Sequence, residues 1–127
     1  MAMLEHVNLT VSDSRKTAEL LCNLFDWKIR WQGSSMDGGG HTVHVGTDDH
    51  YLAVFSPNSG LQTSEISNYR QKGALNHVGV VVDDIAAMEK RVRAAGLTPG
   101  NHQDYEPGTR FYFFDDDQVE YEVVCYR

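Results

Sequence analysis

Three side chains of the kind that bind divalent transition metals stand at related places in the sequence. His6 and His77 each occupy the third position of a short, largely apolar stretch, and Glu122 lies in the last such stretch. Two imidazole nitrogens and one carboxylate oxygen are a recurring ligand set that leaves positions open for water or substrate. A metal held in this way can polarise a carbonyl, bind an enolate or activate oxygen. We therefore predict a divalent metal site at these three residues.

An internal repeat relates these positions to one another. Leu4–Val11 reads Leu-Glu-His-Val-Asn-Leu-Thr-Val, and Leu75–Val82, which begins 71 residues later, reads Leu-Asn-His-Val-Gly-Val-Val-Val. Both stretches are predicted strands that run into a helix start rich in Ser or Asp. A single histidine of this kind would be interpreted as a solvated strand residue, and it is the repetition that favours a ligand. The same offset maps Tyr51 onto Glu122.

Each half of the chain is predicted to form strand–helix–strand–strand–strand, which defines an α+β fold of two tandem βαβββ modules around a half-barrel cleft. The predicted strands are 4–11, 27–31, 41–45 and 51–56 in the first half, and 75–82, 98–102, 109–114 and 119–126 in the second. We expect one domain, 1–127, with module one at 1–56, a linker at 57–74 that contains a short helix near 63–69, and module two at 75–127. A polar hairpin loop is expected at 34–40.

Strand alternation predicts which side chains share the cleft with the ligands. Tyr51 and Tyr112 are expected there, as hydrogen-bond donors to substrate or as packing groups. Arg110 either faces the cleft, where it would bind an anionic group of the substrate, or is a surface charge. We expect Glu122 and Tyr51 to be catalytic, and Tyr51, Arg110 and Tyr112 to bind substrate.

The remaining histidines and the cysteines are given plainer roles. His41 and His44 lie on opposite faces of one predicted strand, so at most one can enter the cleft. His50 and His102 are expected at the surface. Both cysteines are expected to be buried, inert thiols, with Cys22 on the apolar helix face that also carries Ala18, Leu21 and Phe25.

Composition narrows the class of partner. The 127 residues carry a net charge of −7, which disfavours binding to nucleic acid. The sequence has no apolar run near the roughly 20 residues that a membrane span needs, and no signal-peptide pattern at its start. A cytoplasmic protein with a small-molecule substrate is expected.

The repeat and its flanking residues resemble the vicinal oxygen chelate superfamily, which includes glyoxalase I, bleomycin-resistance proteins, fosfomycin-resistance enzymes and extradiol dioxygenases. The residues that carry the resemblance are Leu4–Val11, Asn76–Asp83, Ala94–Gly96, Arg110–Asp115 and Glu120–Val124. The resemblance implies a paired βαβββ fold, a homodimer in which modules from two chains complete each cleft, and metal ligands at His6, His77 and Glu122.

Two departures from the superfamily's patterns indicate which of its branches the chain resembles less. The glyoxalase branch has a further glutamate on the fourth strand of module one, where the offset places Tyr51. This favours a three-ligand arrangement, as in fosfomycin-resistance enzymes. The usual Asp-Pro-Asp-Gly turn is replaced by Asp115–Gln118, and no potassium loop is recognisable, which argues against the thiol-transferring fosfomycin activity.

Two functions are therefore expected from the sequence. The first is a metal-dependent lyase, isomerase or dioxygenase that acts on a small oxygenated substrate chelated to Zn, Ni, Mn or Fe. The alternative is a metal-free protein that sequesters a small molecule, as bleomycin-resistance proteins do. Aromatic residues would line its pocket: Trp27, Trp31, Tyr51, Phe55 and 111–114. Such a binder has no need of the His/His/Glu set, which favours the enzyme.

Overall fold

The computed structural model describes residues 1–35 and 37–127, so residue 36 of the predicted loop 34–40 lies outside the described residues. The chain divides into two compact units, Met1–Gln62 and Thr63–Arg127. The division falls within the stretch 57–74 that the sequence indicates as a linker. Each unit is described by itself.

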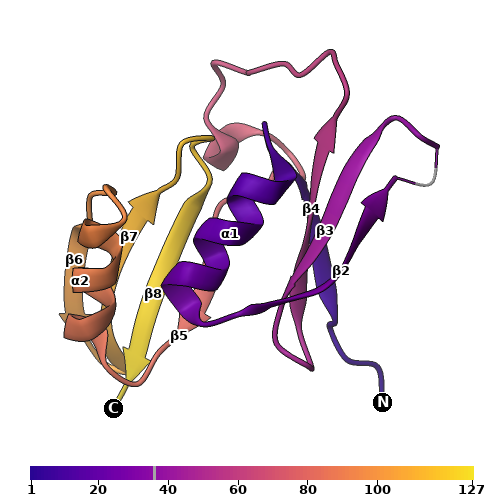
Figure 1. Ribbon diagram of the computed structural model, residues 1–127. Helices are drawn as coiled ribbons and strands as arrows, with labels where there is room; N and C mark the ends of the chain where they lie inside the picture. Colours follow the sequence, from indigo (N-terminus) through magenta and orange to yellow (C-terminus); the bar gives the residue numbers. More distant parts are fainter. Residues whose placement is uncertain (36) are drawn as a thin grey trace. The chain divides into compact units, whose positions relative to one another are not determined.

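The first unit is one four-stranded sheet with one helix (Figure 1). Its elements are β1 (His6–Thr10), α1 (Ser14–Phe25), β2 (Lys28–Ser34), β3 (Gly40–Gly46) and β4 (Tyr51–Pro57). The strand order is β1-β4-β3-β2. The outer strand β1 is parallel to β4, and the other pairs are antiparallel.

The second unit repeats this plan. After a single 3₁₀ turn, η1 (Asn68–Arg70), it contains β5 (Val78–Val81), α2 (Ile85–Ala94), β6 (Gly100–Tyr105), β7 (Gly108–Phe114) and β8 (Glu120–Tyr126). The order β5-β8-β7-β6 matches that of the first sheet. The predicted α+β fold of two βαβββ modules is thus confirmed, and the short helix predicted near 63–69 is the turn at 68–70.

Local sequence signals set the ends of both helices. The Asp13 carboxylate caps α1 by accepting hydrogen bonds from the backbone N–H groups of Arg15 and Lys16, and Asp84 caps α2 through Ala87. Gly96 follows α2 with φ of 82°, the left-handed conformation that glycine adopts without steric cost.

The cores lie between each helix and one face of its sheet. In the first unit Ala18, Leu21 and Leu24 of α1 are buried over β3 and β4. The sequence predicted Phe25 on the buried face of α1, but Leu24 is buried there instead. Phe25 and Cys22 are both half-buried. In the second unit Phe113 and Tyr121 are buried and stack with ring centroids 5.0 Å apart.

Neither cysteine is fully buried, which corrects the prediction for the thiols. Cys22 and Cys125 are both free and half-buried. Burial still raises the pKa of the Cys22 thiol, with a smaller contribution from the nearby Glu19 carboxylate. A raised pKa lowers the thiolate fraction, which is the reactive form. A weakly reactive thiol at Cys22 is therefore still expected, although the side chain is only half-buried.

The strand register corrects the uniform 71-residue offset. His6 pairs with Tyr51 in the first sheet, whereas Glu122 pairs with Gly79, two residues beyond His77. The first-unit counterpart of Glu122 is therefore Ala53, which pairs with Asn8, and the mapping of Tyr51 onto Glu122 is wrong. The connection between the second and third strands gives the physical reason, since β2 ends at Ser34 and β3 begins at Gly40, whereas β6 ends at Tyr105 and β7 begins already at Gly108. A shift of two residues preserves the sheet face, so the face assignments are unaffected.

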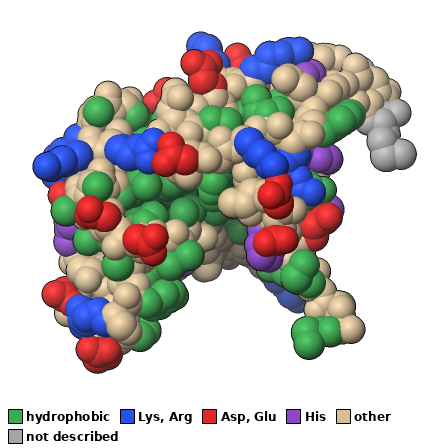
Figure 2. All heavy atoms as spheres, turned by 60° about the horizontal axis from the view of Figure 1, so that its bottom comes forward, with side chains coloured by type: hydrophobic (Ala, Val, Ile, Leu, Met, Phe, Trp, Pro, Cys, Tyr) green, Lys and Arg blue, Asp and Glu red, His purple; other side chains and the backbone are tan. Residues whose placement is uncertain are grey.

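Acidic and basic side chains are interspersed on the face drawn in Figure 2, with hydrophobic side chains exposed between them. Large exposed apolar residues include Val81 on β5, at 65% exposure, and Trp31 on β2, at 49%.

In the ranges 1–35 and 37–127, no helix is long and apolar enough to span a membrane.

One buried carboxylate holds the turn between β7 and β8. Asp115 is 4% exposed, and its Oδ1 accepts hydrogen bonds from the backbone N–H groups of Asp117 at 2.9 Å and Val119 at 3.0 Å. The Tyr121 hydroxyl donates to Oδ2 at 3.2 Å. Burial raises the pKa of Asp115, and the hydrogen bonds oppose that shift. The residue thus fixes the turn that leads into β8.

Replacement of Asp115 by Ala should lower the free energy of unfolding by about 2 kcal/mol, because buried backbone donors lose their acceptor. Asp115→Asn is the matched control, since its amide oxygen can still accept from both backbone N–H groups and only the Tyr121 bond is lost. Urea unfolding followed by circular dichroism measures both variants. Equal losses in the two variants would show that the turn does not depend on these backbone hydrogen bonds.

Candidate metal centre

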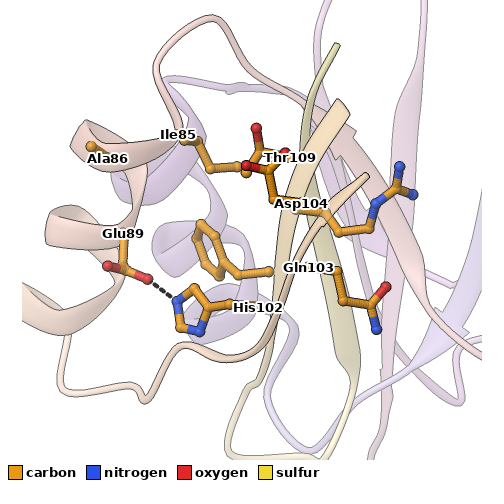
Figure 3. Close-up of a pocket in the computed structure, with 9 residues that line it drawn as sticks. Ile85, Ala86, Glu89, His102, Gln103, Asp104 and Thr109 are labelled. Atoms are coloured by element: carbon orange, nitrogen blue, oxygen red, sulfur yellow. Dashed lines mark hydrogen bonds and ion pairs between the residues drawn. The ribbon is translucent and has the colours of Figure 1, made fainter. Parts of the chain in front are cut away.

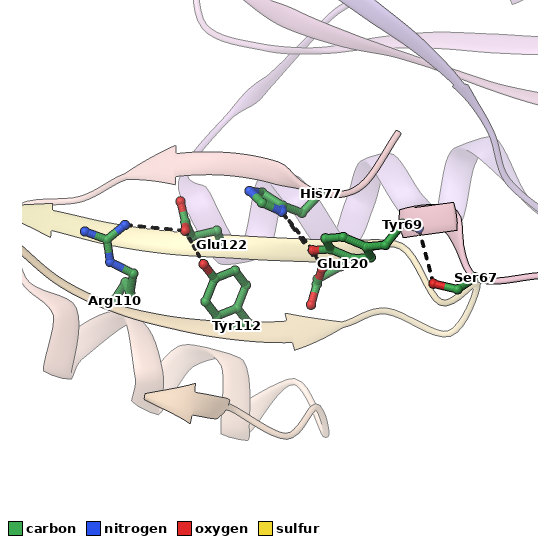
Figure 4. A network of polar contacts seen from close by, with 7 residues as sticks. All are labelled: Ser67, Tyr69, His77, Arg110, Tyr112, Glu120 and Glu122. Carbon is green, nitrogen blue, oxygen red and sulfur yellow. Dashed lines mark hydrogen bonds and ion pairs between the residues drawn. The ribbon is translucent and has the colours of Figure 1, made fainter. Parts of the chain in front are cut away.

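The open face of the second sheet carries a network of polar side chains (Figure 4). His77 precedes β5, Glu120 and Glu122 come from β8, and Tyr112 and Arg110 come from β7. Alternation along paired strands brings these groups to one face, as the sequence predicted for His77, Glu122 and Tyr112.

The two carboxylate oxygens of Glu122 have different surroundings. The Tyr112 hydroxyl donates a hydrogen bond to Oε2, and Arg110 Nη1 lies 3.6 Å from the same oxygen. Oε1 lies over Gly79, 4.0 Å from where a Cβ at that residue would stand. The paired glycine therefore leaves space beside the oxygen that the protein does not use. Hydrogen bonding to Glu122, and then burial, raises the pKa of Tyr112 to about 12.

His77 is held through one of its two ring nitrogens. Nδ1 lies 3.1 Å from the Tyr69 hydroxyl oxygen, and that hydroxyl donates a hydrogen bond to Glu120 Oε1. The Glu120 oxygen is itself 3.9 Å from Nδ1. The ring also meets Tyr112 edge-on, with centroids 5.7 Å apart. Hydrogen bonding to Glu120 raises the pKa of Tyr69 to about 12.

Arg110 faces the same side as Glu122 rather than bulk solvent. Its side chain is 11% exposed, and its guanidinium lies 4.7 Å from the centroid of the Tyr105 ring, a cation–π contact. Among the residues that the structure describes, the buried Nε has no hydrogen-bond partner. A buried donor without a partner is costly in free energy.

His6 is held in the first unit by a related arrangement. Its Nδ1 lies 2.9 Å from Glu5 Oε1, and the Tyr51 hydroxyl donates to the same oxygen at 3.3 Å. The hydrogen bond from His6 lowers the pKa of Glu5. The His6 and Tyr51 rings stack with centroids 4.9 Å apart. Each predicted histidine ligand thus has its Nδ1 engaged by a system of one carboxylate and one tyrosine.

A row of aromatic rings crosses all four strands of the first sheet. Trp31 and His44 are 5.0 Å apart, His44 and Tyr51 are 4.6 Å apart, and Tyr51 stacks on His6. The Arg30 guanidinium lies 4.4 Å from the Tyr51 centroid. Burial lowers the pKa of His44.

His44 is the residue that sequence reasoning left unassigned, since strand alternation allowed only one of His41 and His44 to enter the cleft. His41 lies on the helix side, where its Nδ1 is 2.9 Å from Ser14 Oγ, so His44 shares the face of His6. The sequence could have placed His44 in the cleft only if the strand register had been known, because Trp31 and His44 pair across the β2–β3 hairpin.

A separate pocket of about 280 Å³ lies between α2 and strands β6 and β7 (Figure 3). His102 points from β6 toward Glu89 of α2 and contacts its carboxylate. His102 therefore has a specific partner where the sequence indicated a plain surface residue. None of the three predicted metal ligands lines this pocket.

The donors fit a divalent transition metal in kind. An imidazole Nε2 and a carboxylate oxygen that contact no other described residue are suitable ligands. Across residues 1–35 and 37–127, no group of three or more His, Cys, Asp or Glu side chains is placed to hold an ion. That His6 joins His77 and Glu122 at one metal stays a prediction.

Residues 3–123 match the Glyoxalase/Bleomycin resistance protein/Dioxygenase superfamily, and the chain belongs to it. Solved structures with this fold include SMU.1112c (TM-score 0.82, 23% identity, 98% of each chain covered). A glyoxylase/bleomycin resistance protein/dioxygenase domain from Frankia sp. EAN1pec gives a TM-score of 0.81 at 21% identity, over 100% of this chain and 93% of that one. The fosfomycin resistance protein FosX from Listeria monocytogenes, complexed with Mn(II) and sulfate, gives 0.71 at 17% identity, over 100% and 94%.

Two curated relatives, the adenylosuccinate synthetases of Mycobacterium avium (strain 104) and Mycolicibacterium paratuberculosis (strain ATCC BAA-968 / K-10), are 30% identical over 76 residues. The match covers 60% of this chain and 17% of each relative. It thus concerns a small part of much longer proteins.

The Tyr112–Glu122 hydrogen bond gives a test by pH. The pKa of Tyr112 is raised from 10.0 to about 12, so the stability from this bond is fully present below pH 10.0 and is lost as the pH rises through about 12. Glu122→Gln should return the pKa of Tyr112 toward its ordinary value, measured by NMR of ¹³Cζ-labelled tyrosine. Tyr69 is the internal control, because its pKa depends mainly on Glu120. An unchanged Tyr112 titration would contradict the hydrogen bond.

Proposed function

We propose that the chain is a divalent-metal-dependent enzyme acting on a small oxygenated substrate. The observation that supports this most is the placement of His77 and Glu122 on one face of the second sheet, with Gly79 leaving space at Glu122 Oε1. Membership of the superfamily adds support, as does Mn(II) in a FosX structure of the same fold.

The proposed ligands are His6, His77 and Glu122, and Zn, Ni, Mn and Fe all suit this donor set. When bound, the metal would polarise a substrate oxygen and stabilise negative charge that develops on it. Within the superfamily we favour a lyase or isomerase over a dioxygenase. A homodimer is part of the proposal, on the superfamily resemblance.

The surrounding residues would bind and orient the substrate. Tyr112 stays protonated near neutral pH, since its pKa is about 12, so it does not act as a base. Its hydrogen is donated to Glu122 Oε2, so it is proposed to contact the substrate through its ring and its hydroxyl oxygen. The Arg110 guanidinium, which lies beside Glu122, is proposed to bind an anionic oxygen of the substrate. In the first unit Tyr51 is proposed to orient substrate beside His6, and Glu122 is the proposed catalytic carboxylate.

A metal-free small-molecule binder is the second candidate, and the ring row Trp31–His44–Tyr51–His6 favours it. Trp31 is half exposed, and its ring lies against Gly33, where a Cβ would come within 2.8 Å of Trp31 Cζ2. Glycine at residue 33 thus permits this ring position. Planar aromatic ligands stack on such rings with little loss of conformational entropy.

Metal binding is the decisive measurement. Isothermal titration of chelator-treated protein with Mn²⁺, Ni²⁺ and Zn²⁺ should show a site that His77→Ala or Glu122→Ala weakens by more than about 100-fold, beyond the usual effect of an outer-shell residue. His6→Ala should do the same. His102→Ala is the control, because His102 contacts Glu89 elsewhere in the second unit. Absence of a site in the wild-type protein, or equal affinity in His77→Ala, would refute the enzyme proposal.

The alternative is tested on metal-free protein with 8-anilinonaphthalene-1-sulfonate as the probe. If the ring row is a binding surface, the probe should fluoresce in the presence of chelator, and Trp31→Ala should reduce that fluorescence severalfold. Tyr126→Ala removes another exposed ring, 58% exposed and on β8, and should have little effect. The same signal in Trp31→Ala as in the wild type would exclude the ring row as the binding surface.

A further inference from the structure

We propose that Tyr69 and Glu120 are positioning residues that fix the proton of His77 on Nδ1 and so reserve Nε2 for a metal ion. The metal part of this inference rests on the proposed function, whereas the position of the proton can be measured without any metal. Tyr69 lies in the stretch 57–74, which the sequence indicated as a linker with a short helix near 63–69 and to which it assigned no functional residue.

The two contacts of the Tyr69 hydroxyl determine which ring nitrogen of His77 carries the hydrogen. A hydroxyl group has one hydrogen to donate, and Tyr69 donates it to Glu120 Oε1. The hydroxyl oxygen can then only accept at its 3.1 Å contact with His77 Nδ1. The hydrogen of a neutral His77 ring must therefore be on Nδ1, and Nε2 carries the lone pair.

The opposite arrangement is electrostatically unfavourable. If Nδ1 accepted the Tyr69 hydrogen, the hydroxyl oxygen and Glu120 Oε1 would face each other with no hydrogen between them. An ionised carboxylate can only accept hydrogen bonds, and Glu120 is 14% exposed, so little water is available to replace the lost donor. Leaving a largely buried carboxylate without its donor costs more than leaving a neutral ring nitrogen without one.

The 3₁₀ turn presents Tyr69 to the sheet. The Ser67 side chain caps η1 by accepting a hydrogen bond from the Tyr69 backbone N–H at 3.2 Å. The tyrosine then reaches from this turn to the His77 and Glu120 side chains (Figure 4). A folded turn with a capping residue, rather than a free linker, holds the hydroxyl in place.

The first unit reaches the same tautomer by a shorter route. Glu5 Oε1 lies 2.9 Å from His6 Nδ1, and an ionised carboxylate requires that nitrogen to donate. His6 thus also keeps its lone pair on Nε2. Metal-binding histidines commonly donate their second N–H to a carboxylate, directly or through another group. The two units achieve this with Glu5 in direct contact and with Glu120 through Tyr69.

The tautomer is measured by long-range ¹H–¹⁵N NMR of the histidine rings in the metal-free, full-length chain at about pH 8, where an ordinary histidine is neutral. The wild-type His77 spectrum should show the Nδ1–H form. Tyr69→Phe and Glu120→Leu should each reduce that form, because the first removes the acceptor of the Nδ1 hydrogen and the second removes the acceptor of the Tyr69 hydrogen. The double variant should convert His77 mainly to Nε2–H, the form preferred in water. Tyr126→Phe, which removes an exposed hydroxyl from β8, should leave the spectrum unchanged.

The consequence for metal binding is measured separately by titration with Mn²⁺ and Zn²⁺. Tyr69→Phe should weaken binding by roughly 10- to 100-fold, the usual range for outer-shell partners of a ligand. An Nε2–H form in the wild type, or an unchanged spectrum in the double variant, would overturn the tautomer assignment. Equal metal affinity in Tyr69→Phe and wild type would overturn the positioning role. If wild-type protein shows Nδ1–H but binds no metal, the proposed function fails and the tautomer assignment stands.

Discussion

The parallel pairing of the first and last strands of each unit determines which side chains can meet. β1 pairs with β4 and β5 with β8, so every second residue of both strands faces away from the helix. This pairing brings Tyr51 beside His6 and Glu120 beside His77. The polar contacts of both faces depend on that register, because a shift of one residue would turn each group into the apolar core.

Periodicity made much of this fold predictable. Alternation in Leu4–Val11 and in Leu75–Val82 indicated both outer strands. The Ser- or Asp-rich stretches that follow them indicated the two helix starts, which the structure caps with Asp13 and Asp84. The side of the sheet on which Glu122 and Tyr112 lie was also predictable, because it depends only on odd and even positions. Core details such as Leu24 were not, since they depend on how a helix rotates against its sheet.

The site was less predictable where it depends on register or on segments without periodicity. A uniform offset aligned Tyr51 with Glu122, and a shorter connection between β6 and β7 than between β2 and β3 shifts that alignment to Ala53. Alanine has no metal-binding atom in its side chain, so the first unit has no carboxylate at the position that corresponds to Glu122. Tyr69 gave no signal at all, because a residue in an irregular stretch has no pattern that assigns it to a face.

Carboxylates organise the tyrosines on both sheets. Glu5, Glu120 and Glu122 each accept a hydrogen bond from one tyrosine hydroxyl: Tyr51, Tyr69 and Tyr112 respectively. Each bond stabilises the neutral phenol, which is why the pKa values of Tyr69 and Tyr112 rise. Each phenol therefore stays protonated and holds its carboxylate in place beside the neighbouring histidine or arginine.

Gly79 has a consequence for how this protein can be altered. Its φ lies outside the left-handed region, so the backbone there accepts any residue, and a Cβ would make only an ordinary contact with Glu122. The fold therefore imposes no requirement for glycine at this residue. Side-chain volume at residue 79 becomes a graded steric control over the Glu122 carboxylate: alanine, serine and valine would narrow its approach stepwise while charge and strand pairing stay the same.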